Sequence, residues 1–156
     1  LAAAIQENET IVPVYIIDER YLQTDSWGLV RTAPYRLQFL LESLIDLQNY
    51  LQEKGSNLLV YQGVPTLLIP QLAKQYGANR VYATREYTHE ELQQETAIGE
   101  QLDLRLYHGQ CLYHPADIPF AIEQLPDVFT QFRKRVEKYS SVRELLPSPE
   151  KVVSPP

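Results

Sequence analysis

The sequence predicts an α/β domain with a doubly wound parallel sheet of the Rossmann-like class. Short β-branched runs alternate with apolar patterns of helical period, as in successive right-handed β-α-β units. The first run, residues 11–17, is apolar on both of its faces, which is typical of a strand covered by helices on two sides. With 156 residues, the chain is long enough for one domain with a substantial core.

The predicted elements follow in a simple order. Ala2 to Ile5 has the pattern of a helix end. After the strand at 11–17, Pro34 suits the first turn of a helix whose leucines recur at helical spacing, and Gly55 suits its end. The remaining predicted elements are a strand at 58–61, a helix from Pro65 to Tyr76, a strand at 80–84, a helix from Thr88 to Leu102, a strand at 104–107 and a helix from Val128 to Tyr139 capped by Asp127.

Both ends of the sequence indicate that further chain exists. Methionine is absent, including at position 1, and the sequence opens within a helical pattern. The first strand of a doubly wound sheet is central, so we expect the central strand to precede Leu1 and its absence to leave a gap. Residues 140–156 are rich in proline and lack an apolar period, which predicts a linker after a domain at 1–139.

Composition excludes several classes of function. The net charge is −6, from 14 basic and 20 acidic residues, so the surface as a whole should repel phosphate backbones. One cysteine, Cys111, excludes an internal disulfide and fits a reducing compartment. Apolar runs are too short to span a bilayer, and no signal-peptide pattern is visible. We expect a soluble intracellular protein, in the cytoplasm or an organelle, with no membrane partner.

Residues 81–91 contain the candidate ligand site, because a strand there feeds a helix through a charged loop. Thr88 and Glu91 have the spacing of a capping box at the helix start. Open α/β sheets bind ligands at the carboxyl ends of their strands. The polar side chains expected at that edge are Arg85, Glu86, His89 and Glu90. The plainer interpretation is that these are solvated loop charges, which every α/β domain has.

The residue types at this site favour binding over catalysis. Glu90 can accept hydrogen bonds from a flat heterocycle, and Trp27 with the tyrosines 15, 35 and 87 can supply flat walls. No serine, cysteine or histidine forms a recognisable nucleophile–base set, and no opposing carboxylate pair is visible. Glycine loops that cradle phosphates are also missing. We therefore predict no catalytic residue in this chain.

Two further motifs are predicted to be structural. His108, Cys111 and His114 have a spacing that resembles a metal site, but no second Cys/His pair completes it. We predict that the imidazoles hydrogen-bond locally while Tyr107, Leu112 and Tyr113 pack, and that no metal binds. The basic run at residues 133–138 is predicted to be a solvated helix face rather than a DNA-binding patch.

Three blocks of sequence carry a family resemblance. They are Arg85-Glu86-Tyr87-Thr88-His89-Glu90-Glu91, Leu112-Tyr113-His114-Pro115-x-Asp117-Ile118-Pro119-Phe120 and Leu125-Pro126-Asp127-Val128-Phe129-Thr130-Gln131-Phe132-Arg133-Lys134. Together with residues 32–43 and 145–149, they resemble the N-terminal domain of the photolyase/cryptochrome family, and most of all its DASH-type cryptochromes. The resemblance runs in order over essentially the whole chain.

The resemblance implies an antenna domain that is followed by a helical FAD-binding domain. It implies a folate antenna, methenyltetrahydrofolate, between the two. Glu90 matches the glutamate that hydrogen-bonds the pterin, and the weaker candidates around it are His89, Glu86, Trp27 and Tyr35. The family uses light to transfer an electron from reduced FAD to a cyclobutane pyrimidine dimer, in DASH members chiefly in single-stranded DNA.

This chain lacks the family's opening strand and its FAD domain, so we expect DNA contact only through that domain and no repair by these residues alone. The parent protein is expected to be a photolyase, a blue-light sensor or a fusion that retains only the antenna-like domain. The alternative is a nucleotide-binding α/β module of related topology, such as an electron-transfer-flavoprotein-like or universal-stress-like domain. That alternative predicts phosphate contacts from a glycine loop, which the sequence does not contain.

Overall fold

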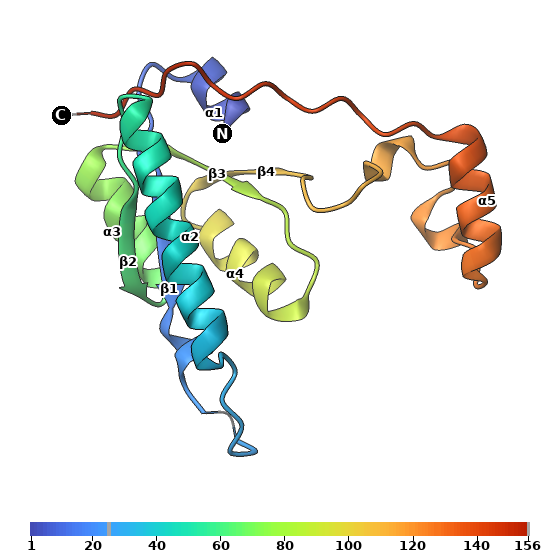
Figure 1. Ribbon diagram of the computed structural model, residues 1–156, viewed down its shortest axis with the longest axis horizontal. Coiled ribbons are helices and arrows are strands. Elements are labelled where there is room, and N and C mark those ends of the chain that lie inside the picture. Colours follow the sequence, from blue (N-terminus) through green and yellow to red (C-terminus); the bar gives the residue numbers. More distant parts are fainter. Residues whose placement is uncertain (25, 156) are drawn as a thin grey trace.

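The computed structural model describes residues 1–24 and 26–155, in which helices alternate with strands (Figure 1). The elements are α1 (Ala2–Glu7), β1 (Val14–Asp18), η1 (Glu19–Leu22), α2 (Pro34–Glu53), β2 (Leu59–Gly63), α3 (Pro65–Tyr76), β3 (Arg80–Thr84), α4 (His89–Gly99), β4 (Asp103–Tyr107), η2 (Pro115–Asp117), η3 (Ile122–Gln124) and α5 (Phe129–Tyr139). This order confirms the predicted α/β class.

The strands form two parallel pairs. β1 pairs with β2, from Val14 opposite Leu59 onward, and β3 pairs with β4, from Arg80 opposite Asp103 onward. Among the residues that the structure describes, no ladder joins the pairs, so the prediction of one continuous sheet is wrong. The predicted gap is present, because no strand in the described part of the chain hydrogen-bonds to both pairs. That the missing strand comes from residues before Leu1 stays a prediction.

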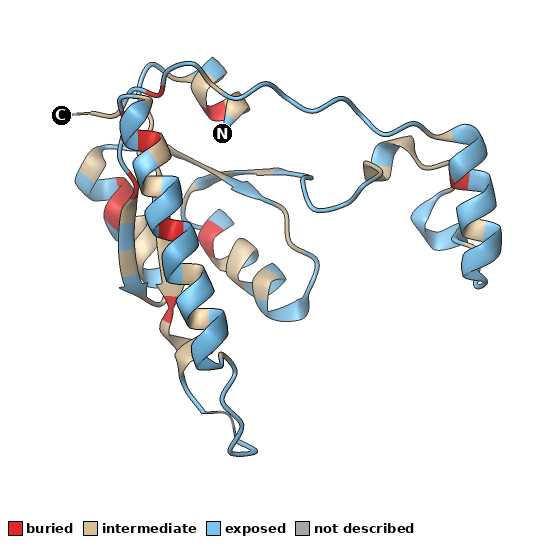
Figure 2. Cartoon of the chain, in the orientation of Figure 1, coloured by how far each residue is buried: buried red, intermediate tan, exposed pale blue. Residues whose placement is uncertain are grey.

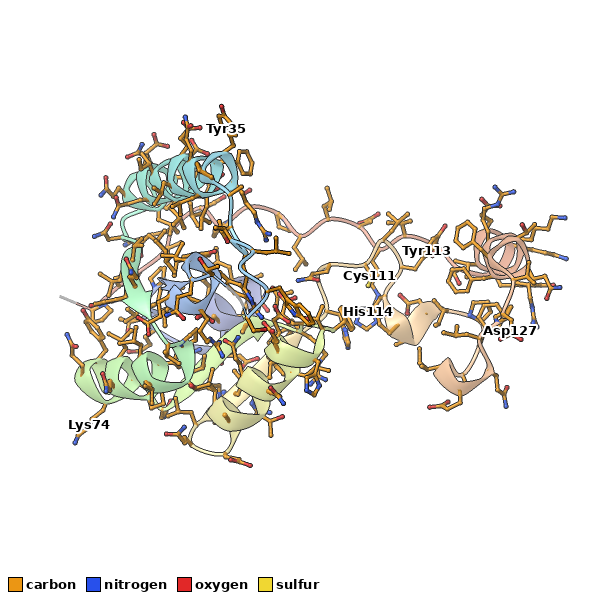
Figure 3. The ribbon with its side chains drawn as sticks, turned by 90° about the horizontal axis from the view of Figure 1, so that it is seen from below. Tyr35, Lys74, Cys111, Tyr113, His114 and Asp127 are labelled. Carbon is orange, nitrogen blue, oxygen red and sulfur yellow. The ribbon has the colours of Figure 1, made fainter. Side chains whose placement is uncertain are left out.

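The strands lie between two layers of helices, with α2 on one side and α3 and α4 on the other (Figure 3). Side chains alternate along a strand, and Tyr15 and Ile17 of β1 pack against the cluster under α2. The buried members of that cluster are Leu44, Leu51, Leu58 and Val152. In the other layer the buried residues are Leu72 and Ala73 of α3 and Ile98 of α4. These two layers make the doubly wound arrangement.

The helix ends follow local chemistry at α2 and at α3, which runs from Pro65 to Tyr76 as predicted, and depart from it at α4 and α5. α2 starts at Pro34 and stops before Gly55, whose φ of +86° is the left-handed conformation expected after a helix. Thr88 is the N-cap residue of α4, but its side chain makes no capping hydrogen bond, so the predicted capping box is wrong. The predicted Asp127 cap is also wrong, because α5 begins one residue later with Val128 at the N-cap position.

Residues 108–150 form an arm that carries α5 well away from the two sheets (Figure 1). Its own small core consists of stacked rings, with Phe132 lying 5.8 Å from Phe120 and 6.2 Å from Phe129 between centroids. Val136 of α5 is also buried, while most of the arm is exposed (Figure 2). The basic run at 133–138 is exposed, as predicted, apart from that valine.

The end of the chain returns to the body beside α2 (Figure 1). Val152 is 0% exposed, and its N–H donates to the carbonyl of Lys54 at 2.9 Å. The N–H of Ile11 donates to the carbonyl of Val153 at 2.8 Å, and the hydroxyl of Ser154 donates to the carbonyl of Ile11 at 3.0 Å. Residues 140–155 contain no helix or strand, and Val152 near their end is part of the core. That this segment is a linker stays a prediction.

Candidate functional site

A cavity of about 620 Å³ opens where β1 ends and α4 begins. Its lining residues are Tyr15, Ile16, Asp18, Tyr21, Arg31, Arg36, Pro65, Glu86, Glu90, Glu91 and Gln94. It therefore lies between the two strand pairs, at the carboxyl end of β1, where open α/β sheets bind their ligands. Its volume is in the range of small-molecule sites.

Asp18 contributes a buried carboxylate to the lining of this cavity. As the last residue of β1 it is buried, and its carboxylate accepts hydrogen bonds from Arg20 Nε at 2.9 and 3.1 Å and from the Arg20 backbone N–H at 3.0 Å. Burial raises the pKa of Asp18, but the hydrogen bonds and charge of Arg20 outweigh it and bring the pKa below its ordinary value. This carboxylate is thus ionised and already saturated with donors.

Glu90 lies in the first turn of α4 and is held by Arg31 from the loop after η1. The guanidinium donates to both carboxylate oxygens, at 2.8 and 2.9 Å. These hydrogen bonds lower the pKa of Glu90. Both side chains are partly exposed, at 37% for Arg31 and 49% for Glu90, so the pair is solvated and contributes little to stability. An incoming ligand can therefore displace Arg31 at small cost.

Glu91, the next residue, is the more deeply placed carboxylate. Its Oε1 accepts a hydrogen bond of 2.7 Å from the hydroxyl of Tyr21, which comes from η1 on the far wall. That hydrogen bond raises the pKa of Tyr21 to about 12, so the phenol stays a donor. Among the described side chains, Glu91 Oε2 is the buried oxygen for which no hydrogen-bond partner is found. This orphan acceptor belongs to a cavity-lining residue.

Glu86 also lines the cavity, as predicted from its place after β3. Its backbone N–H donates to Glu95 Oε1 at 2.7 Å, which fixes the loop to α4. Its own carboxylate accepts from Gln110 Nε2 at 2.6 Å. The site therefore contains three neighbouring glutamates in different hydrogen-bonding states.

The other three predicted site residues lie outside the cavity lining. His89 starts α4 but faces a separate hollow of about 370 Å³, where its Nε2 lies 3.0 Å from Gln93 Nε2. Trp27 is 85% exposed, in the loop closed by an antiparallel bridge between Thr24 and Val30. Tyr35 is 87% exposed and points away from the body on the outer side of α2 (Figure 3). Of the five predicted contact residues, the cavity therefore brings together Glu86 and Glu90, and Tyr15, one of the expected flat walls, lines it with them.

Sequence reasoning assigned no ligand role to Tyr21, Arg31 or Glu91. The sequence pattern assigned Glu91 to a capping box, but in the structure its carboxylate accepts a hydrogen bond from the distant Tyr21. Tyr21 comes from η1 and Arg31 from the loop that follows it, and no periodicity predicts the path of this segment. The two residues meet α4 across 70 and 59 residues of sequence. Asp18 was detectable, because it ends a strand on the edge where ligands bind.

The motif around Cys111 makes local hydrogen bonds. The hydroxyl of Tyr87 lies 2.7 Å from His108 Nδ1, and His114 Nδ1 accepts from the Ala116 N–H at 3.1 Å. The expected packing of Leu112 is wrong, since this side chain is exposed in the arm. In the described part of the chain, no group of three His, Cys, Asp or Glu side chains is arranged to hold a metal ion. Across the same residues, no helix has the length and apolar character that a membrane crossing needs.

Comparisons with known proteins agree with this architecture. The sequence model of the DNA photolyase family matches residues 1–151. The chain is 41% identical over 162 aligned residues to a cryptochrome DASH of Synechocystis, covering 96% of this chain and 33% of that protein. It is also 41% identical over 143 residues to the blue-light photoreceptor PHR2 of Arabidopsis thaliana, covering 88% of this chain and 32% of that protein.

A solved structure shows the same fold. The crystal structure of a Synechocystis cryptochrome matches with a TM-score of 0.88 and 38% identity, over 99% of this chain and 35% of that one. The chain thus spans about a third of the length of the relatives it matches. The family match overturns the alternative of an electron-transfer-flavoprotein-like or universal-stress-like module. The chain belongs to the DNA photolyase family, as an N-terminal α/β domain homologous to that of the DASH cryptochromes.

Proposed function

We propose that this domain binds a folate antenna, methenyltetrahydrofolate, and passes the light energy that it absorbs to a flavin elsewhere in the parent protein. The observation that carries the proposal is the cavity at the carboxyl end of β1, which is lined by tyrosine rings and by Glu90. A pterin is a flat heterocycle with amino and ring N–H donors. Flat walls and carboxylate acceptors are the groups that such a ring needs.

Membership of the DNA photolyase family implies flavin and antenna chromophores as cofactors. The greater length of the relatives is consistent with a further domain in the parent. We propose that this domain is helical, follows residues 140–156 and holds FAD. On this proposal, the parent performs light-driven repair of cyclobutane pyrimidine dimers in single-stranded DNA or senses blue light, and DNA contacts only the FAD domain.

Glu90 is the proposed principal contact of the antenna, and Glu86 lines the same cavity. Arg31 donates a hydrogen bond to each carboxylate oxygen of Glu90, so this carboxylate can accept two parallel N–H donors. A pterin offers a similar pair, so its binding would exchange Arg31 for the ring. His89, Trp27 and Tyr35 would contact the antenna only after rearrangement or from the interface with the FAD domain.

The test uses the complete product of the gene. Glu90→Gln keeps the shape of the side chain and removes its charge, and Glu90→Ala removes both. We expect each to lower the affinity for methenyltetrahydrofolate at least about tenfold, because charge-assisted hydrogen bonds are lost. Near-ultraviolet absorption after purification and titration measures this. Glu100→Gln, an exposed glutamate at the other end of α4, is the control. Wild-type folate occupancy in both Glu90 variants would contradict the proposal.

A further inference from the structure

We infer that the arm at residues 108–150 is a surface on which the rest of the parent chain docks, with Leu145 and Leu146 as its main anchors. The inference rests on the proposed function, because it takes the docked part to be the domain that is proposed to hold the flavin. Its starting point is the small core of the arm. Among residues 108–150, all of which the structure describes, Val136 alone is buried.

The large apolar side chains of the arm lie in water instead (Figure 2). Four of them are at least 70% exposed, namely Leu112, Phe129, Leu145 and Leu146. A single exposed leucine needs no explanation, but several large apolar groups on one short segment mark an interaction surface. The arm therefore lacks a cover that a partner can supply.

Leu145 and Leu146 lie on an extended segment that is fixed on both sides. Before them, the guanidinium of Arg143 donates to both carboxylate oxygens of Asp117, at 2.5 and 2.8 Å, which ties the segment to η2. After them, Val152 is fixed in the core beneath α2. A surface that is ordered before binding loses less entropy when a partner docks on it. The two leucines are thus presented as ready-made anchors.

The root of the arm ties it to the candidate site. The carbonyl of Tyr107, the last residue of β4, accepts a hydrogen bond of 2.9 Å from the N–H of Arg85. Gln110 Nε2 donates to the carboxylate of Glu86 at 2.6 Å, and Glu86 lines the cavity. Because β4 is parallel to β3, the arm leaves the sheet at the edge where Glu86 and Glu90 lie.

The length of the relatives indicates what covers the arm. This chain spans about a third of the relatives it matches, so about two thirds of each relative lies outside the matched part. Transfer of light energy weakens steeply with distance, so a flavin that receives it must lie near the antenna. A domain that docks on the arm stands beside the edge that carries Glu86 and Glu90. A second copy of this chain, or DNA, would cover the arm without bringing a flavin to this edge.

The test measures whether position 145 is covered in the complete gene product. Leu145→Cys and Leu67→Cys each introduce a thiol, and Leu67 is the control because α3 lies at the other end of the molecule from α5 (Figure 1). Leu145 is 96% exposed in this domain and Leu67 62%, so the domain by itself predicts faster maleimide labelling of Leu145→Cys.

The inference predicts the reverse order of labelling. Leu145→Cys should react at least about tenfold more slowly than Leu67→Cys, because burial of one leucine favours the covered state by at least that factor. Peptide mass spectrometry assigns the label to its position. Labelling of Leu145→Cys that is as fast as that of Leu67→Cys would overturn the inference.

The partner is identified in the same protein. Slow labelling of Leu145→Cys that persists on dilution, together with photo-crosslinks from position 145 to residues beyond 156, supports docking of the parent chain. Slow labelling that disappears on dilution shows a second copy, and slow labelling that requires single-stranded DNA shows a nucleic-acid surface. Either of these two results overturns the inference.

A charge at the anchor tests whether the arm is covered as one surface. Leu145→Glu leaves the core of this domain intact, because the side chain is exposed here. In the complete gene product it should speed the labelling of Phe129→Cys at least about tenfold, since docking then loses a buried leucine and must cover a charge. Leu67→Glu is the matched control and should leave that rate unchanged. Equal rates in the two variants would contradict a shared cover.

The outcomes separate this inference from the proposed function. Near-ultraviolet absorption of the purified protein reports the folate, whereas thiol labelling reports the docking. If folate is bound and Leu145→Cys labels as fast as Leu67→Cys, the inference fails and the proposed function stands. If Leu145→Cys is protected and crosslinks beyond residue 156 while no folate binds, the docking surface is supported and the proposed antenna fails.

Discussion

Val152 offers a direct test of how the end of this chain is held. Its side chain is 0% exposed and packs with Leu44, Leu51 and Leu58 beneath α2. Val152→Ala removes both methyl groups, at about 0.8 kcal/mol each for lost burial, and leaves a small cavity. We expect the docked end to lose about 2–3 kcal/mol, which corresponds to roughly 30- to 150-fold more frequent opening.

Hydrogen exchange of the complete gene product measures this opening at two amides. The N–H of Ile11 donates to Val153 and the N–H of Val152 to Lys54, so both lose protection when the segment leaves. Val153→Ala is the control, because that side chain is 40% exposed and contributes its backbone to the same hydrogen bonds. Equal acceleration in the two variants would refute the assignment of Val152 as the anchor.

Three further outcomes follow from charge and backbone geometry. The pKa of Asp18 is lowered in the folded state, so its ionisation stabilises the fold at pH values above the ordinary carboxyl pKa of about 4. This stability is lost as pH falls through the folded-state pKa. In Asp18→Asn, the free energy of unfolding should therefore fall less steeply at acid pH. Gly77→Ala should cost about 1 kcal/mol in thermal unfolding because its φ is +64°, whereas Gly99→Ala, in the last turn of α4 with only ordinary contacts, should gain up to about 1 kcal/mol. With a net charge of −6, residues 1–156 should not bind a thymine-dimer oligonucleotide tightly in a fluorescence titration. A submicromolar affinity that falls with added salt would show that the basic run at 133–138 binds DNA.

The parts of the fold that sequence predicts are those set by local chemistry. Pro34 and Gly55 bracket α2 because proline fits a first helical turn and glycine tolerates a positive φ. The β1 run is apolar because helices cover both of its faces. By contrast, the division into two sheets depends on whether a strand lies between the pairs, and a pattern of four strands cannot show which of them are neighbours.

The candidate site was predicted to the level of its sheet edge and no further. Glu86 and Glu90 reach the cavity because they follow β3 at the carboxyl end of the strand. Trp27 and Tyr35 were chosen for their flat rings, but ring chemistry does not determine direction, and both point to solvent. Tyr21 and Glu91 also line the cavity, and they meet across 70 residues in a contact that no local signal encodes.

The most direct test of the account is a crystal structure of the complete gene product, purified with its chromophore. The account predicts density for a flat bicyclic ring in the cavity between β1 and α4, with ring N–H groups within about 3 Å of the carboxylate oxygens of Glu90 and with Arg31 displaced. Density for polypeptide filling this cavity, with the antenna bound elsewhere or absent and the Arg31–Glu90 pair intact, would contradict it.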